Sequence, residues 1–352
     1  CISSAASDVY KRQILVAGGL LAPGGSYVED GAQLSSFSIF AASSPSIEDV
    51  RPYVDVIEKM IRRYKFLQKP LEESTLPRIV QYVNRFNEDD SQKLAVAIAL
   101  SISMGLTSAS VLAPLQKDHL TKDGHALAFI SEVFRTYLHD QTMEQLASAL
   151  RKGNIRDWLL FFPQTKRAQP DAIAAHFRSE EVNLPQVADY YGRRQTKELR
   201  DQTATDLADL VRSEESSPAE MVAMLQERAT KLGQSAEEFV PVVWEGLMRG
   251  LDAEVKQDQM ELLVPKEVER LASVLEPWTS SARAEIALIN TIQLHCYTDT
   301  RLFRSFAVFL KILYNENVLS DGAILYWASK GAKPQGKQHF LKLAEPLLNV
   351  CH

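Results

Sequence analysis

Apolar residues recur every three or four positions along most of this chain, and that spacing constrains its fold more than any other feature. Residues spaced in this way share one face of an α-helix, which can be buried against a neighbouring helix. Between residues 50 and 67 the apolar positions are Val54, Ile57, Ile61, Tyr64 and Leu67. Comparable segments cover residues 94–104, 126–138, 143–150, 221–232, 239–250, 266–275, 286–296 and 302–314. The pattern predicts a predominantly helical protein.

One segment, residues 34–42, alternates apolar and polar residues in the manner of a strand. A single strand cannot build a sheet, so we expect an extended connector there and an all-α fold. Short turns between helices are typical of antiparallel helix pairs, and stacked pairs form an α-α superhelix of the HEAT type. The sequence shows no repeat of fixed period, so this expectation depends on helix spacing.

Local signals mark where several helices begin and end. Ser217 is followed by Pro218 and, three residues on, by Glu220, which is the pattern of a capping box with proline at the first helical position. Gly233 directly follows the apolar segment and has the position of a C-terminal cap. Ser46 precedes Asp49 by three residues in a weaker version of the first signal.

The composition is that of an ordinary globular protein, and the net charge indicates which kinds of partner the chain can bind. The chain has 352 residues, of which 45% are hydrophobic and 24% charged, and this length suffices for two packed domains or one long solenoid. The formal net charge of −6 argues against a direct nucleic-acid binder, which usually carries a basic excess. A negative charge suits a protein that meets basic partners.

The cysteines and the hydropathy pattern indicate a cytoplasmic protein without a membrane span. Cys1, Cys296 and Cys351 form no pair with the spacing of a zinc site or a redox dithiol, which favours a reducing compartment. No run of about 18 apolar residues is present. Residues 1–13 lack an initiator methionine, and we expect them to be a non-native segment.

Polar composition indicates one domain boundary. The segment 162–170 is polar, bounded by prolines and without apolar periodicity. We therefore expect a first domain over 14–165 and a second over 182–350.

No pattern in the chain predicts catalysis, a metal or a cofactor. The glycines at 18, 19, 24 and 25 lack the Gly-Lys-Ser/Thr that opens a helix in a phosphate-binding loop, so a tight turn is the better interpretation. The seven histidines are scattered and form no ligand set such as His-Glu-x-x-His. No Gly-x-Ser-x-Gly framework surrounds a nucleophile. We expect a non-enzymatic protein without cofactors.

Several short stretches, taken together, resemble one family. They are ILVAGGLLAPGG at 14–25 with EDG at 29–31, IRRYKFL at 61–67, LRKGN at 150–154, LYNENVLSDGAILYW at 313–327, and the pairs Gly336-Lys337 and Phe340-Leu341. This set is similar to the factor-5 mimic proteins, also called basic leucine zipper and W2 domain-containing proteins. The resemblance covers about residues 14–348. The run at 313–327 resembles the first aromatic–acidic box of W2 domains, and residues 336–341 resemble the approach to the second.

The resemblance implies a cytoplasmic regulator of translation initiation. Its first half would be like the middle domain of initiation factor 4 gamma, and its second half would be a W2 domain. It would bind initiation factor 3 and lysine-rich segments of the beta subunit of initiation factor 2, with the ribosomal preinitiation complex as a further partner. It would thereby compete with initiation factor 5 and affect start-codon stringency. Two other functions stay open: a W2-bearing guanine-nucleotide exchange subunit, and a general HEAT-type protein-binding scaffold.

Two groups of residues are candidates for partner binding. In the box, rings could contact a basic peptide that carboxylates attract, and Ser320 is placed to cap the helix that carries two of those rings. The candidate residues are Tyr314, Glu316, Asp321, Tyr326, Trp327 and Phe340. The alternative is that the rings pack in the core and the acids are solvated. A possible basic patch, formed by Arg62, Arg63 and Lys65, could meet an acidic partner or RNA, or could simply be a solvated helix face.

The box also departs from the family pattern. Asn315, Asn317 and Gly322 stand where acidic residues are common in that family, and the acidic tail that normally follows the second box is not seen before His352. Both departures reduce the negative charge available to a lysine-rich partner.

Overall fold

The computed structural model describes residues 13–22, 25–28, 33–169, 171–213, 216–254 and 259–351. Within these ranges the chain is built from helices without a strand, and its one pairing of the β kind is an isolated antiparallel bridge between Leu21 and Tyr27. The expected all-α fold is therefore confirmed. The segment expected to be non-native lies, except for Gln13, outside the described residues.

The chain divides into two compact units, Cys1–Gly192 and Arg193–His352. The division falls within one long helix, α11, which spans Pro185–Arg212. Each unit has its own hydrophobic core, so each is described by itself.

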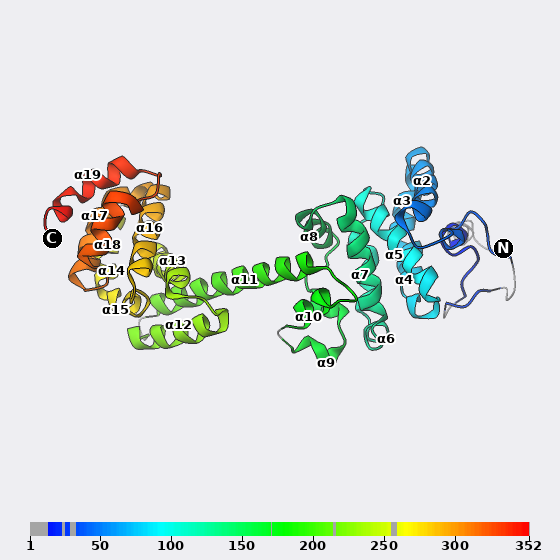
Figure 1. The fold of residues 1–352 in the computed structure, drawn as a ribbon, viewed down its shortest axis with the longest axis horizontal. Helices are drawn as coiled ribbons and strands as arrows, with labels where there is room; N and C mark the ends of the chain where they lie inside the picture. Colours follow the sequence, from blue (N-terminus) through cyan, green and yellow to red (C-terminus); the bar gives the residue numbers. More distant parts are fainter. Residues whose placement is uncertain are drawn as a thin grey trace. The chain divides into compact units, whose positions relative to one another are not determined.

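The first unit begins with a helical turn at residues 13–17 and continues with paired helices of unequal length (Figure 1). Its longest helices before α11 are α2, α5 and α7, and α5 packs along α7. The elements are η1 (Ile39–Ala41), α2 (Ile47–Arg63), η2 (Lys65–Leu67), α3 (Gln68–Pro70), η3 (Leu71–Thr75), α4 (Leu76–Val80), η4 (Val83–Arg85), α5 (Glu88–Ser103), η5 (Ala109–Gln116), α6 (Asp118–Thr121), α7 (His125–Asp140), α8 (Met143–Lys152), η6 (Trp158–Phe161), α9 (Gln164–Arg167) and α10 (Ala172–Arg178).

The second unit packs its helices around α16, which lies against α13 and contacts the last helices of the chain. After the C-terminal part of α11, its elements are α12 (Pro218–Leu232), α13 (Ala236–Glu254), α14 (Met260–Arg270), α15 (Ala272–Leu275), η7 (Glu276–Trp278), α16 (Ala282–Thr298), η8 (Thr300–Ser305), α17 (Phe306–Asn315), α18 (Asp321–Tyr326), η9 (Trp327–Gly331) and α19 (Lys337–Leu348).

The helix caps lie where the sequence predicts them. Ser217 and Glu220 form a reciprocal capping box at the start of α12, and Gly233 ends that helix with a φ of 59° in the left-handed region. The Ser46 side chain accepts a hydrogen bond from the backbone N–H of Asp49 at the start of α2. These side chains satisfy N–H groups that a helix leaves without partners in its first turn.

The glycine run forms a turn, as the sequence predicts, whereas the segment at 34–42 forms turns and not the expected extended connector. Residues 39–41 are a single turn of 3-10 helix rather than a strand. Gly18 and Gly25 have φ values of 79° and 88°, which favour glycine, whereas Gly24 lies outside the described residues. A Cβ on Gly25 would lie 2.8 Å from both Cβ and Cγ of Tyr82, so the turn also needs the small residue for close packing.

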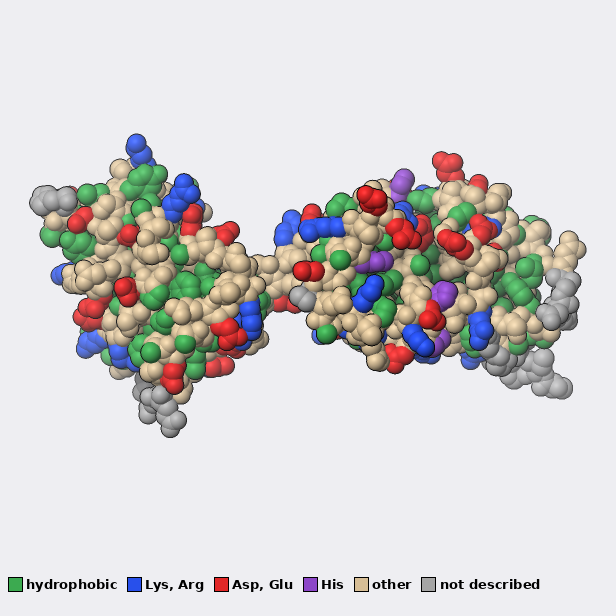
Figure 2. Space-filling view, turned by 60° about the horizontal axis from the view of Figure 1, so that its bottom comes forward, with side chains coloured by type: hydrophobic (Ala, Val, Ile, Leu, Met, Phe, Trp, Pro, Cys, Tyr) green, Lys and Arg blue, Asp and Glu red, His purple; other side chains and the backbone are tan. Residues whose placement is uncertain are grey.

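Acidic and basic side chains are intermixed over the exposed face of each unit shown in Figure 2. Among the described helices, none combines the length and apolar character needed to cross a membrane.

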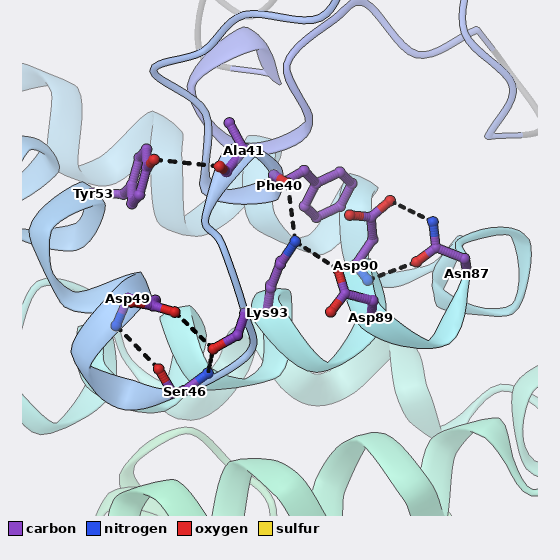
Figure 3. A network of polar contacts seen from close by, with 10 residues as sticks. Phe40, Ala41, Ser46, Asp49, Tyr53, Asn87, Asp89, Asp90 and Lys93 are labelled. Atoms are coloured by element: carbon purple, nitrogen blue, oxygen red, sulfur yellow. Dashed lines mark hydrogen bonds and ion pairs between the residues drawn. The ribbon is translucent and has the colours of Figure 1, made fainter.

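A buried lysine joins η1 to α5 in the first unit (Figure 3). The Lys93 side chain is 6% exposed, and its Nζ lies 2.5 Å from Asp89 Oδ2 and donates to the carbonyl of Phe40 at 3.3 Å. The Phe40 ring packs edge-on against Phe86, with centroids 5.2 Å apart. One ion pair and one hydrogen bond thus offset the cost of burying this ammonium group.

Candidate functional site

The structure places Trp327 and Phe340 in the core of the second unit. Both side chains are fully buried, and the ring of Phe306 lies between them, 5.1 Å from the Trp327 ring and 4.7 Å from the Phe340 ring by centroid distance. The Trp327 indole N–H donates to the side-chain oxygen of the buried Gln293 at 3.0 Å. These two rings therefore pack α17, η9 and α19 together and present no surface to a partner.

Tyr314 and Asp321 also face inward rather than outward. Tyr314 is half-buried, and the neighbouring Asp321 carboxylate raises the pKa of its phenol, first by a hydrogen bond and then by its negative charge. The same carboxylate lies beside Cys351, whose thiol pKa is raised chiefly by burial. Ser320 caps α18 through the N–H of Ala323, as the sequence predicts. This arrangement closes the end of the unit.

Only Glu316 and Tyr326 of the candidate box residues are exposed. The Tyr326 side chain is 50% exposed. Segment 306–350 carries three acidic residues against five lysines, namely Lys311, Lys330, Lys333, Lys337 and Lys342. This excess of lysines in the segment does not favour a lysine-rich peptide, because like charges oppose association.

A better site for a cationic group lies at the other end of α16. An apolar cavity of about 250 Å³ opens between α13, α14, α16 and η8, and its base is formed by buried side chains: Met248, Leu251, Met260, Val264 and Leu302. It adjoins a shallow hollow of about 460 Å³ that shares His295 and Asp299. We call the cavity and its charged rim the acidic pocket.

Three carboxylates and two arginines line the acidic pocket, and a fourth carboxylate, Asp201, pairs with one of these arginines from outside the lining. The Arg301 guanidinium pairs with Asp252 at 2.8 Å and with Asp299 at 2.6 Å. In the same way, the Arg249 guanidinium pairs with two carboxylates, Asp201 at 2.7 Å and Glu245 at 2.6 Å. Two guanidinium groups therefore neutralise only half of the carboxylate charge.

The electrostatics of this rim favour a negative pocket at neutral pH. Burial lowers the pKa of His295, so its imidazole adds no positive charge. Hydrogen bonds from Arg301 hold the pKa of Asp299 below its ordinary value, so that carboxylate stays ionised. An apolar base beneath ionised carboxylates suits a lysine side chain, whose stem is apolar and whose ammonium is charged.

The acidic pocket was not predicted from the sequence, although one signal was present. Glu245, Arg249 and Asp252 are spaced by four and three residues and share one face of α13. Asp201 and Asp299 come from distant parts of the chain, and only the fold brings them to that face.

The possible basic patch lies at the C-terminal end of α2. Arg62, Arg63 and Lys65 are all exposed. Arg62 pairs with Glu58 one turn earlier at 2.5 Å, and the Arg63 guanidinium lies 5.6 Å from the centre of the Tyr64 ring. This patch belongs to the first unit, whereas the aromatic–acidic box and the acidic pocket belong to the second.

Within the described residues the fold is that of an all-α protein built from two helical units. The family model described as "5MP1/2 HEAT domain" matches residues 11–201, and the model described as "W2: eIF4-gamma/eIF5/eIF2-epsilon" matches residues 284–350. The expected order of a HEAT-type domain followed by a W2 domain is thus confirmed. The chain belongs to the eIF5-mimic protein family.

Curated relatives match nearly the whole chain. Protein krasavietz of Drosophila melanogaster is 30% identical over 331 residues, which cover 94% of this chain and 77% of that protein. The eIF5-mimic protein 1 of Homo sapiens is 27% identical over 330 residues, covering 93% and 78%. The eIF5-mimic protein 2-A of Danio rerio is 28% identical over 332 residues, covering 94% and 77%. No solved structure matches the chain.

Proposed function

We propose that this chain is a cytoplasmic regulator of translation initiation that acts by binding and not by catalysis. Its relatives are named for mimicry of initiation factor 5, and its W2 segment is of the type shared by initiation factors 4 gamma, 5 and 2 epsilon. The proposal is that it binds initiation factors 2 and 3 and competes with factor 5 on the preinitiation complex, which affects start-codon stringency.

The acidic pocket is the proposed docking site for lysine-rich segments of the factor-2 beta subunit. The observation that carries this proposal is the excess of carboxylates over guanidinium groups around a 250 Å³ apolar cavity. A lysine stem would fill the cavity, and its ammonium would share the carboxylates with Arg301 and Arg249. Because ion pairs with the two arginines already order these carboxylates, little reorganisation precedes binding.

The box residues take different proposed roles. Glu316 and Tyr326 are exposed and would form a peripheral contact, whereas Trp327 and Phe340 would act by holding the helices that carry them. The two surfaces are separated along α16. Glu285, which accepts hydrogen bonds from Ser320, lies ten residues before His295 of the pocket, or about 15 Å along the helix.

Calorimetric titration of the whole chain with the lysine-rich factor-2 peptide tests this proposal. The wild type should bind saturably and more weakly as salt rises, because exposed charges are screened over a Debye length of about 8 Å at physiological ionic strength. The pocket variant Glu245→Ala/Asp252→Ala should weaken binding by roughly three- to tenfold. Glu237→Ala/Glu269→Ala removes two exposed acids elsewhere on the unit and should bind as the wild type does.

A separate variant distinguishes the two surfaces. Glu316→Ala/Tyr326→Ala removes the exposed part of the box without touching the core, which Trp327→Ala would disrupt. If this variant alone weakened binding, the peptide would dock on the box and not in the pocket. Absence of peptide binding by the wild type at low salt would contradict the proposed function.

A further inference from the structure

The segment from Arg62 to Phe66 is a continuous exposed stretch in which cations and aromatic rings alternate. Its sequence is Arg-Arg-Tyr-Lys-Phe, and all five residues are exposed. It begins in the last turn of α2, which ends at Arg63, and continues into η2, which begins at Lys65. We call it the aromatic–basic corner. The proposed function does not use this surface.

The two rings of the corner are unusually accessible. The Phe66 side chain is 71% exposed and Tyr64 is 44% exposed, and their ring centroids lie 6.0 Å apart at an interplanar angle of 62°. Two exposed rings next to each other are costly to leave in water, since fully burying a phenylalanine is worth about 1.5–3 kcal/mol. A partner with flat apolar faces would cover them.

The cations of the corner are partly free. Arg62 pairs with Glu58, and Lys69, one turn further on, pairs with Glu73 at 3.8 Å. Arg63 and Lys65 have no acidic partner within the described part of the chain, and Arg63 instead lies over the Tyr64 ring. Two cations without an acidic partner therefore alternate along the chain with two accessible rings.

We infer that the aromatic–basic corner binds single-stranded RNA. Bases would stack on Tyr64 and Phe66, while Arg63 and Lys65 would contact the phosphates on either side, which is how proteins bind single strands without sequence preference. An acidic peptide would satisfy the cations but leave the rings without a matching surface, and duplex RNA does not expose its base faces. The net charge of −6 opposes RNA at long range, so the contact is local and salt-sensitive.

Fluorescence anisotropy of the whole chain with a labelled twelve-nucleotide oligouridylate tests the inference over a range of salt concentrations. The wild type should bind at low salt. Tyr64→Ala/Phe66→Ala should weaken binding at least about thirtyfold, because two base–ring stacks are lost and each is worth about 1–3 kcal/mol, and should leave the salt dependence unchanged. The logarithm of the association constant falls linearly with the logarithm of the salt concentration, by about 0.7 for each phosphate that the protein neutralises on a single strand. Arg63→Ala/Lys65→Ala should therefore make this slope less steep by about 1.4.

Control variants remove the same number of positive charges, or an exposed ring, elsewhere on the first unit. Lys117→Ala/Lys122→Ala removes two other exposed lysines of the same unit and should leave the slope unchanged. Phe37→Ala removes a ring that is 79% exposed, next to η1. Because η1 contacts the N-terminal part of α2 through Tyr53, this ring lies away from the corner and its loss should have no effect.

Four outcomes would overturn the inference. Three of them are the absence of oligouridylate binding at low salt, binding that the ring variant does not weaken, and equal binding of duplex RNA. Displacement of the RNA by an oligoglutamate of equal charge at equal concentration would show a simple charge contact and would also overturn it. None of these outcomes bears on the peptide titration, which concerns the second unit.

Discussion

The indole N–H of Trp327 and the side-chain oxygen of Gln293 form a hydrogen bond of 3.0 Å inside the second unit. The same oxygen accepts from the backbone N–H of Lys333 at 3.1 Å, and the Gln293 amide donates to the carbonyls of Lys333 and Gln335 at 2.8 and 2.7 Å. One fully buried glutamine thus joins α16 to η9 and to the segment before α19. The tryptophan of the aromatic–acidic box is therefore part of a buried polar network that orders the end of the chain.

Gln293→Leu should destabilise the second unit by about 3 kcal/mol. The substitution keeps the volume but leaves the indole N–H and three backbone groups without partners, and a buried unsatisfied polar group costs about 1–3 kcal/mol. Urea unfolding followed by tryptophan fluorescence measures the loss. Gln338→Leu, at an exposed position of α19 outside this network, should change stability by less than about 0.5 kcal/mol. Equal stability of the two variants would contradict the role assigned to Gln293.

Gly153→Ala should destabilise the first unit by about 1–3 kcal/mol, because overpacking displaces neighbouring atoms. A Cβ there would lie 2.5 Å from the backbone nitrogen of Ser110 and 2.7 Å from the carbonyl carbon of Ala109, and backbone atoms cannot move aside cheaply. Calorimetric unfolding measures the effect. Gly192→Ala, in the exposed interior of α11 with open space around it, should instead stabilise by about 0.5–1 kcal/mol through helix propensity. The prediction is contradicted if the two substitutions change the stability in the same direction.

Acid should destabilise the first unit in part through His176. Burial, and next the positive charge of Lys166, lower the pKa of this imidazole in the folded state. The Ser131 hydroxyl donates to the Leu127 carbonyl at 2.7 Å and so accepts from Nε2–H of a neutral His176 at 2.9 Å. The unfolded state therefore takes up the proton more readily than the folded state. The stability that neutral His176 contributes to the folded state is fully present above a pH of about 6.5, the ordinary pKa of histidine. It is lost as pH falls below that value.

Melting temperatures between pH 7.5 and 5.5 measure this contribution. His176→Gln can still donate to Ser131 and should lose less stability over that range than the wild type does. His125→Gln, at an exposed position of α7, should retain the full pH dependence. A His176→Gln profile that parallels the wild type would show that other groups cause the acid sensitivity.

Local features of the fold were predictable from sequence, and features that depend on distant contacts were not. The caps at Ser217, Gly233 and Ser320 lie as predicted because a cap depends on a few neighbouring residues. The 28-residue length of α11 was missed, since its polar middle shows helical spacing only in places. The helix α11 is continuous, although its sequence has no sustained apolar stripe that would predict it.

The site was less predictable than the fold for a related reason. Apolar spacing shows that a ring such as Trp327 is on the apolar face of a helix, but it cannot show whether the core or a partner covers that face. The acidic pocket combines Asp201, Glu245 and Asp299, which lie on three separate elements. The charge balance of a surface depends on such groupings and not on the order of residues in one motif.

Lys93→Met should loosen η1 while leaving the rest of the first unit folded. The substitution keeps the aliphatic stem but removes the ion pair with Asp89 and leaves the Phe40 carbonyl without its side-chain donor (Figure 3). The apolar packing of Phe40 on Phe86 would remain, so detachment should be partial. Hydrogen exchange at Ile39–Ala41 should be at least about fivefold faster, which corresponds to the loss of about 1 kcal/mol of local stability from one hydrogen bond. Gln92→Met, at the adjacent half-buried position of α5, should leave exchange at η1 unchanged, and equal protection in the two variants would show that packing alone holds this segment.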